Sequence, residues 1–139
     1  MQPSDEDPSC EITHWGLTRG YGAEQVEVAS EFSGVIIEQS SFIFYEEVTE
    51  VPIERGIQFG IRYALQNLNA TDTIISRVYH PEFIKEDGTS ETVSNYETDI
   101  SENITAWVLD QSWELVKGDW SFQIIHEGRI LCSKDFKTV

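Results

Sequence analysis

Histidine, cysteine and carboxylate side chains are the groups of this sequence that could do chemistry, and their spacing decides what they can do. The chain contains three histidines, His14, His80 and His126. Imidazole nitrogens bind zinc, but these residues are far apart, and none belongs to the short paired spacing of a metal-binding helix or hairpin. Because solitary histidines more often have structural or surface roles, we expect no metal site.

The carboxylates are too numerous to indicate a catalytic pair. The chain has 25 Asp and Glu residues, so some pair will lie at the separation used by glycosidases by chance. The sequence also lacks a Gly-x-Ser-x-Gly elbow, a phosphate-binding loop, a dinucleotide fingerprint and a His-Glu-x-x-His motif. We therefore expect no catalytic residue, no cofactor and no enzymatic activity.

The four tryptophans are the other candidates for a ligand site. An indole ring either stacks on a ligand or fills a core, and aromatic residues supply much of the buried area of a small domain. We assign Trp107 and Trp120 to the core. Trp15 and Trp113 are left as a candidate ligand patch, with core packing as the alternative, and two exposed coplanar rings there would favour a carbohydrate ligand.

The charge of the chain limits its partners. The 139 residues include nine Lys and Arg, which form no cluster, and the net charge is −16. A surface this acidic repels nucleic-acid phosphates and anionic lipid, so we expect no nucleic-acid partner. No segment approaches the run of about 18 apolar residues that a membrane helix needs, so we expect no membrane insertion. A protein or carbohydrate partner remains, and solubility is the alternative role of the acids.

The elements that must position these residues are short strands. Apolar residues recur at a spacing of two, most clearly over residues 57–65, and turn signals separate one such segment from the next. No segment has the length, periodicity and caps of a helix. The expected strands cover residues 14–21, 25–29, 35–37, 42–45, 57–65, 73–80 (ended by Pro81), 91–98 and 104–109. This pattern predicts an all-β protein, an antiparallel β-sandwich.

The last third of the chain is expected to form a long hairpin. Trp120, Phe122 and Ile124 point to one face of an extended strand. Glu127 and Gly128 can turn the chain because glycine tolerates a positive φ, and residues 129–138 return. One apolar face of this hairpin needs a second sheet to cover it.

Three motifs occur along the chain: Gly56-x-x-Phe59-Gly60-x-Arg62-Tyr63, His80-Pro81, and Trp113-Glu114-Leu115-x-x-Gly118-x-Trp120-x-Phe122-Gln123 followed by Phe136. Together they resemble a bacterial family of uncharacterised domains, the domain-of-unknown-function family thirty-eight fifty-nine. The similarity covers most of the chain from about His14 onward. The resemblance implies an immunoglobulin-like β-sandwich and carries no activity that could be transferred to individual residues.

The two cysteines, Cys10 and Cys132, are too few for a metal cluster and are not a Cys-x-x-Cys pair. In immunoglobulin-like sandwiches the first strand often lies beside the last, which could bring the two thiols together. The alternative is that both are free, because Cys10 lies in a polar N-terminal segment. We predict a flexible leader over residues 1–11 and a single sandwich domain over residues 12–139.

The first residues show no signal-peptide pattern. The expected location is periplasmic or extracellular if a signal peptide has been removed, and cytoplasmic otherwise. The leading functional hypothesis is a non-enzymatic β-sandwich module that binds a partner or supports assembly. The alternatives are a carbohydrate-binding module and a hydrolase acting on an extracellular polymer.

Overall fold

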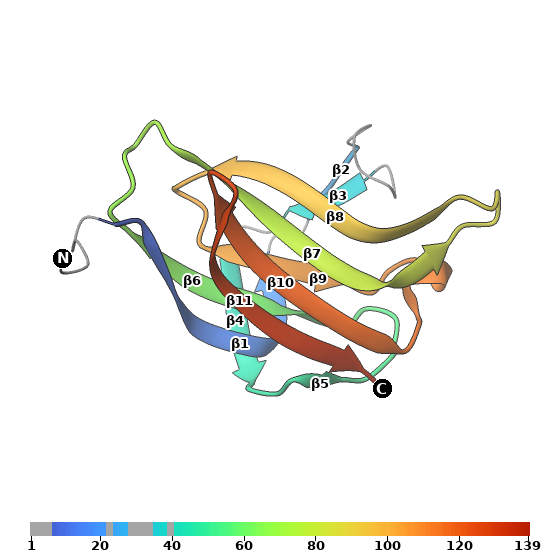
Figure 1. Cartoon of the computed structure of the whole chain (residues 1–139). Coiled ribbons are helices and arrows are strands. Elements are labelled where there is room, and N and C mark those ends of the chain that lie inside the picture. The colour runs from blue at the N-terminus through green and yellow to red at the C-terminus, as the bar shows by residue number, and fades with distance from the viewer. Residues whose placement is uncertain (1–6, 22–23, 28–34, 39–40) are drawn as a thin grey trace.

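Two β-sheets packed face to face make up the protein (Figure 1). The computed structural model describes residues 7–21, 24–27, 35–38 and 41–139. The strands are β1 (Ser9–Tyr21), β2 (Glu24–Glu27), β3 (Val35–Glu38), β4 (Ser41–Glu46), β5 (Glu50–Val51), β6 (Gln58–Gln66), β7 (Thr73–Ile84), β8 (Ser90–Asp99), β9 (Ile104–Val108), β10 (Gly118–His126) and β11 (Arg129–Thr138), and a short 3-10 helix, η1, covers Ser112–Glu114.

The strands are divided between the two main sheets. One sheet has four strands in the order β4-β1-β6-β9, the other has five in the order β5-β11-β10-β7-β8, and β2 and β3 form a separate pair. All pairs are antiparallel except the short contact of β5 with β11. None of the described segments forms a helix that is long and apolar enough to span a membrane. The prediction of an antiparallel β-sandwich is confirmed.

The core lies between the inner faces of β6 and β10. Phe59, Ile61 and Tyr63 of β6 are buried, as are Trp120, Phe122 and Ile124 of β10. The ring of Phe59 meets the rings of Trp120 and Phe122 edge to face, at centroid distances of 5.0 and 5.5 Å. Because residues two apart on a strand share a face, the two period-two patterns of the sequence become one aromatic core, as predicted.

A disulfide joins the two sheets. Cys10 of β1 and Cys132 of β11 are bonded, with their Cα atoms 5.5 Å apart. Each strand belongs to a different sheet, so the bond is a covalent link across the sandwich. Of the two alternatives considered for the cysteines, the bonded one is correct.

The N-terminal boundary differs from the prediction. Strand β1 begins at Ser9 and pairs with β6 from that residue, with Cys10 opposite Leu65. Residues 9–11, assigned to the leader, therefore belong to the sandwich, because the sheet pairing and the disulfide hold them there. Residues 1–6 lie outside the described residues. The same is true of residues 28–29, the end of the strand expected over residues 25–29.

Strand β7 continues through Pro81, where the sequence predicted its end. The pairing of β7 with β8 shifts register between Tyr79 and Phe83, which marks a bulge. The pairing of β7 with β10 ends at Tyr79. A proline is tolerated here because a bulge requires no ladder hydrogen bond from its nitrogen.

Candidate functional site

The two tryptophans of the candidate ligand patch have different neighbours. Both Trp15 and Trp113 are half-buried and pack against the core. The ammonium nitrogen of Lys134 in β11 lies 4.1 Å from the centroid of the Trp15 ring. Trp113 in η1 meets the ring of Phe83 in β7 edge to face, at 5.6 Å. The structure thus places one ring beside β11 and the other beside β7.

The histidines lie in three separate surroundings. His14 is exposed on β1, 3.0 Å from the hydroxyl of Thr13. His80 is buried in the core, and His126 is buried at the end of β10. The described residues contain no group of three or more His, Cys, Asp or Glu side chains that could hold a metal ion.

The buried ring of His80 forms a bridge with the partly exposed Glu91. That ring stacks on Phe83 at a centroid distance of 3.9 Å. Its Nδ1 lies 2.7 Å from the carbonyl oxygen of Pro81, and its Nε2 lies 3.0 Å from Oε1 of Glu91. A carbonyl oxygen only accepts hydrogen bonds, so Nδ1 donates to Pro81. The bridge connects the β7 bulge to the start of β8 and is a structural feature of the core.

A buried carboxylate, Glu114, supports the segment after β9. One oxygen accepts from the indole nitrogen of Trp107 at 2.6 Å, and the other accepts from the backbone nitrogens of Asp110 and Gln111 at 3.2 and 2.7 Å. Burial raises the pKa of Glu114 above its ordinary value, against these hydrogen bonds, which lower it. All of its partners belong to the protein, so we assign Glu114 a structural role. Trp107 is half-buried against the core, while Trp120 is fully buried, which agrees with the core assignment of both.

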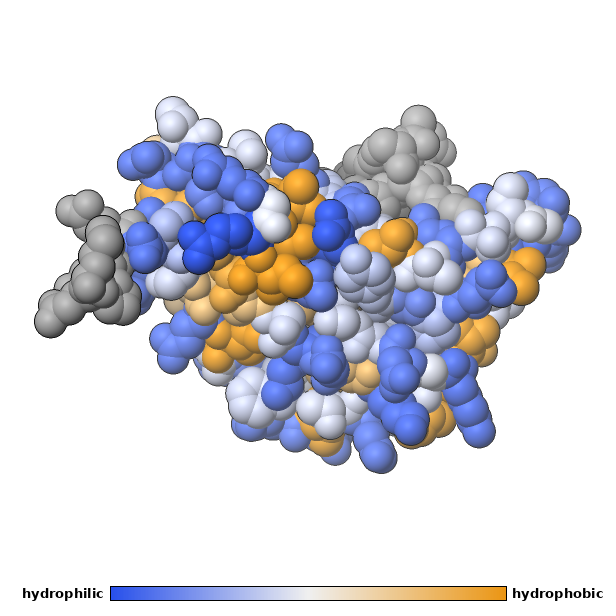
Figure 2. All heavy atoms as spheres, viewed as in Figure 1, coloured by the Kyte–Doolittle hydropathy of each residue, from blue (hydrophilic) through white to orange (hydrophobic). Residues whose placement is uncertain are grey.

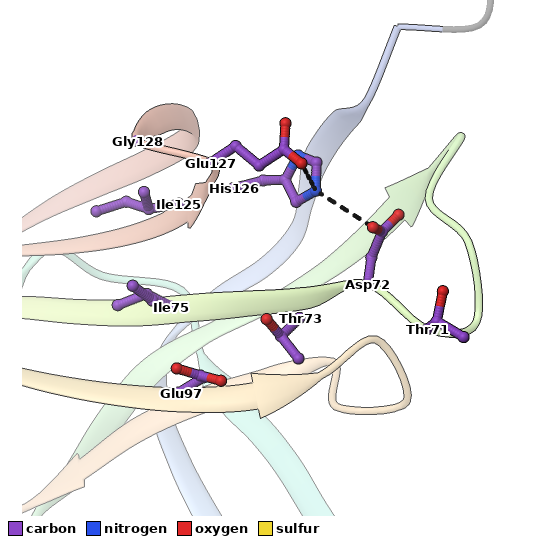
Figure 3. Close-up of a pocket in the computed structure, with 9 residues that line it drawn as sticks. All are labelled: Thr71, Asp72, Thr73, Ile75, Glu97, Ile125, His126, Glu127 and Gly128. Atoms are coloured by element: carbon purple, nitrogen blue, oxygen red, sulfur yellow. Dashed lines mark ion pairs between the residues drawn. The ribbon is translucent and has the colours of Figure 1, made fainter.

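A groove at one end of the five-stranded sheet is the best candidate for a binding site (Figure 3). It has a volume of about 320 Å³, at the lower end of the range of ligand pockets. It lies where the start of β7, the end of β8 and the β10–β11 turn come together. The residues that line it are Thr71, Asp72, Thr73, Ile75, Glu97, Ile125, His126, Glu127 and Gly128.

The β10–β11 turn shapes one wall of the groove. Glu127 and Gly128 both have positive φ, 47° and 78°, as the two central residues of a tight hairpin turn require. This confirms the predicted hairpin. A register shift between Ile124 and Ile125 precedes the turn, and both of these residues and His126 are buried. The register shift is a bulge, and it interrupts the alternation of buried and partly exposed side chains along β10 at the groove.

Isoleucines form the apolar part of the groove. Ile75 and Ile125 are opposite each other in the pairing of β7 with β10, so their side chains lie on the same face. Ile125 is also opposite Ile130 of β11. We call Ile75, Ile125 and Ile130 the isoleucine row. The side chain of Ile130, at its outer end, is 57% exposed.

Acidic side chains surround the apolar part. Asp72, Glu97 and Glu127 come from the start of β7, from β8 and from the turn. The backbone nitrogen of Asn69 donates to Oδ2 of Asp72 at 2.7 Å, which fixes this carboxylate in place. Among the described residues, no Lys or Arg lies within ion-pair distance of the three carboxylates.

His126 lies beside Asp72 and Glu127, as Figure 3 shows, while Glu97 lies apart from it on β8. The side chain of His126 is only 10% exposed. Its Nε2 lies 3.7 Å from Oδ1 of Asp72 and 4.0 Å from Oε1 of Glu127, distances within the range of an ion pair but too long for hydrogen bonds. The groove therefore combines an apolar part, three acids without a Lys or Arg partner among the described residues, and a buried imidazole. Sequence reasoning considered His126 only as a possible zinc ligand and Glu127 only as a turn residue, and it did not group them with Asp72 and Glu97, which are far away in the sequence.

An apolar area continues from the groove along the outer face of the five-stranded sheet. Figure 2 shows it toward the β10–β11 turn, bordered by hydrophilic side chains. The exposed Ile130 contributes to this face. A lone exposed apolar residue needs no explanation, but one that continues a row into a groove is typical of an interaction site.

The two packed sheets place the protein in the class of immunoglobulin-like sandwiches, and solved structures agree. The crystal structure of an immunoglobulin-like protein from Pseudomonas aeruginosa matches with a TM-score of 0.69 and 23% sequence identity, over 96% of this chain and 97% of that one. The likeness at this identity concerns the fold. The chain belongs to the family described as Domain of unknown function (DUF3859), whose model matches residues 6–138. A search of curated proteins found no match.

Proposed function

We propose that the domain is a non-enzymatic module that binds a protein partner through the outer face of its five-stranded sheet, at the groove and the isoleucine row. The geometry of the buried polar groups supports a role without catalysis. The carboxylate of Glu114 is occupied by hydrogen bonds from Trp107, Asp110 and Gln111, and the imidazole of His80 by Pro81 and Glu91.

The observation that carries this proposal is the isoleucine row. It leads from a well-exposed side chain, Ile130, through the buried Ile125 to Ile75 in the groove. Such continuity gives a partner an apolar contact that ends in a concave, polar site, which is the arrangement of a protein interface with a core and a rim. A carbohydrate ligand has less support, because no Trp, Tyr or Phe ring on which a sugar could stack is among the described residues that line the groove.

The test is a pair of matched substitutions. Ile130 and Ile84 are both 57% exposed and both lie in the five-stranded sheet, but only Ile130 belongs to the isoleucine row. Partners would be crosslinked in the native cell to the wild type, to Ile130→Asp and to Ile84→Asp, after circular dichroism has shown that both variants fold. We expect a partner that the wild type and Ile84→Asp retain and that Ile130→Asp loses. A partner retained by Ile130→Asp, or lost equally by both variants, would contradict the proposal.

The location proposed for the protein is an oxidising compartment outside the cytoplasm. The support is the Cys10–Cys132 disulfide, because such bonds persist in the periplasm and outside the cell and are rare in the reducing cytoplasm. Thiol alkylation of the endogenous protein immediately after lysis, together with fractionation, tests this. We expect a fully bonded protein in the periplasmic or extracellular fraction. A reduced protein in the cytoplasmic fraction would overturn the assignment.

A further inference from the structure

We infer that the groove receives the side chain of a lysine or arginine from the protein partner. This inference rests on the proposed function and specifies the chemistry of that contact. It follows from three properties of the groove, which are its apolar part, its excess of acidic over basic side chains and its dimensions.

The apolar part of the groove suits the stem of a long cationic side chain. Ile75 and Ile125 form a continuous apolar surface across β7 and β10. Lysine and arginine side chains carry three or four methylene groups, which bury against apolar surface while the charged end remains near polar groups. A small inorganic cation would gain nothing from the isoleucines, and neither would a fully polar ligand.

The negative charge of the groove favours a positively charged group at the end of that side chain. Asp72, Glu97 and Glu127 line it, and no Lys or Arg of the described residues lies within ion-pair distance of them. The ring of His126, which is 10% exposed, lies 3.7 Å from Asp72 and 4.0 Å from Glu127, so two of the three carboxylates share this one basic neighbour. An ammonium or guanidinium group would supply both positive charge and hydrogen-bond donors. The chain as a whole, with a net charge of −16, attracts such a partner over a longer range.

The spacing of the acids favours an organic cation over a metal ion. The described residues include no cluster of His, Cys, Asp and Glu close enough to hold a metal, although four residues of these types line the groove. Groups that are too dispersed to coordinate one metal ion can still surround the larger, multiply donating head of a lysine or an arginine. The groove volume of about 320 Å³ is adequate for one such side chain.

Short blocked peptides of known composition provide the probe. A Gly-Lys-Gly peptide and a Gly-Arg-Gly peptide would be titrated at low salt into the folded, disulfide-bonded domain while its backbone amides are followed by NMR. The matched control peptide has norleucine in place of lysine, which keeps the stem and removes the charge. We expect saturable shifts at the amides of Thr73, Ile75, His126 and Gly128 with both cationic peptides and none with the norleucine peptide.

Substitutions that remove one charge each test the site. The two groove variants are Asp72→Asn and Glu97→Gln. Asp72→Asn keeps a side-chain oxygen that can accept the hydrogen bond from Asn69, and Glu97 is exposed on β8, so neither change should disturb the fold. The control is Glu86→Gln, an exposed acid in the β7–β8 turn outside the groove. Each groove variant should weaken peptide binding roughly threefold and the double variant about tenfold, as expected for partly exposed ion pairs. Glu86→Gln should leave binding unchanged.

Three results would overturn the inference. These are shifts that do not map to the groove, equal binding of the norleucine peptide, and equal weakening by Glu86→Gln, which would mean that general charge attraction is responsible. A failure of this inference can be distinguished from a failure of the proposed function. If the native partner needs Ile130 but tolerates the double variant Asp72→Asn/Glu97→Gln, the outer sheet face is the interface and the cationic contact is wrong.

Discussion

Removal of the Cys10–Cys132 disulfide should make the domain only marginally stable. The bond closes a loop with a sequence separation of 122 residues. In the chain-entropy model, a loop of that length lowers the entropy of the unfolded chain by about 16 cal/mol/K, which corresponds to about 5 kcal/mol at room temperature. Single domains are stable by only about 5–15 kcal/mol, so this one bond accounts for a large share of the total.

The expected loss converts into a measurable shift of the unfolding temperature. The entropy of unfolding is about 2.1 cal/mol/K per residue near 60 °C, or about 290 cal/mol/K for the 139 residues of this chain. A loss of about 5 kcal/mol therefore lowers Tm by about 17 °C. The double variant Cys10→Ala/Cys132→Ala removes both thiols, so that no reactive cysteine complicates the comparison.

Thermal unfolding followed by circular dichroism is the assay, and reduction of the wild type is the matched control. The double variant and the reduced wild type should unfold at the same lower temperature. Their urea m-values should exceed that of the bonded protein, because an unfolded chain without the crosslink exposes more surface. A decrease in Tm of less than about 5 °C in both samples, or two free thiols in the denatured but unreduced wild type, would refute the reasoning.

Three further substitutions test the core and its buried polar groups. Phe122→Ala should cost about 3–5 kcal/mol by leaving a cavity, with a far-UV spectrum that stays β-rich; a cost below about 1 kcal/mol in urea unfolding would place Phe122 outside the core. Glu91→Ala should cost about 1–3 kcal/mol by leaving the buried His80 ring nitrogen unpaired, whereas Glu91→Gln, whose amide can still bond that nitrogen, should cost less; equal costs would argue against the bridge. For Glu114, the raised pKa means that the folded protein holds this proton more tightly than the unfolded chain, so its contribution to stability is complete below the ordinary value of 4.5 and is lost as the pH rises through the raised value. Glu114→Gln should therefore flatten the decrease of stability above pH 4.5, while costing about 1–3 kcal/mol because its amide group opposes the Trp107 or backbone donors; an unchanged pH profile would contradict this.

The sandwich and its core could be predicted because the sequence patterns that indicate them lie within short segments of the chain. Alternation over residues 57–65 and at Trp120, Phe122 and Ile124 is visible in a short window, and each window independently indicates one buried face. The turn at Glu127 and Gly128 has the same local character. The predicted end of the strand at Pro81 was wrong. A proline disrupts a strand where its nitrogen would have to donate a hydrogen bond to a neighbouring strand, and the bulge in the pairing with β8 removes that hydrogen bond.

The groove could not be predicted because its chemistry depends on the register of distant strands. Asp72, Glu97 and Glu127 converge only after β7 pairs with both β8 and β10. Nothing in a chain with 25 acids marks these three in advance. The state of Cys10 and Cys132 depended in the same way on the adjacency of β1 and β11, which the resemblance to a family suggested but spacing alone did not decide.

The position of the disulfide also governs how the molecule responds to mechanical force. Cys10 and Cys132 are covalently joined, so tension applied to the chain outside the two cysteines passes through the bond and does not load the segment between them. Residues 133–138 of β11 can still be pulled away from β10, but the segment between the cysteines can extend only after reduction, to roughly 440 Å at about 3.6 Å per residue over the separation of 122 residues. A domain tethered at both ends in an assembly would thus keep its groove intact under load for as long as it stays oxidised.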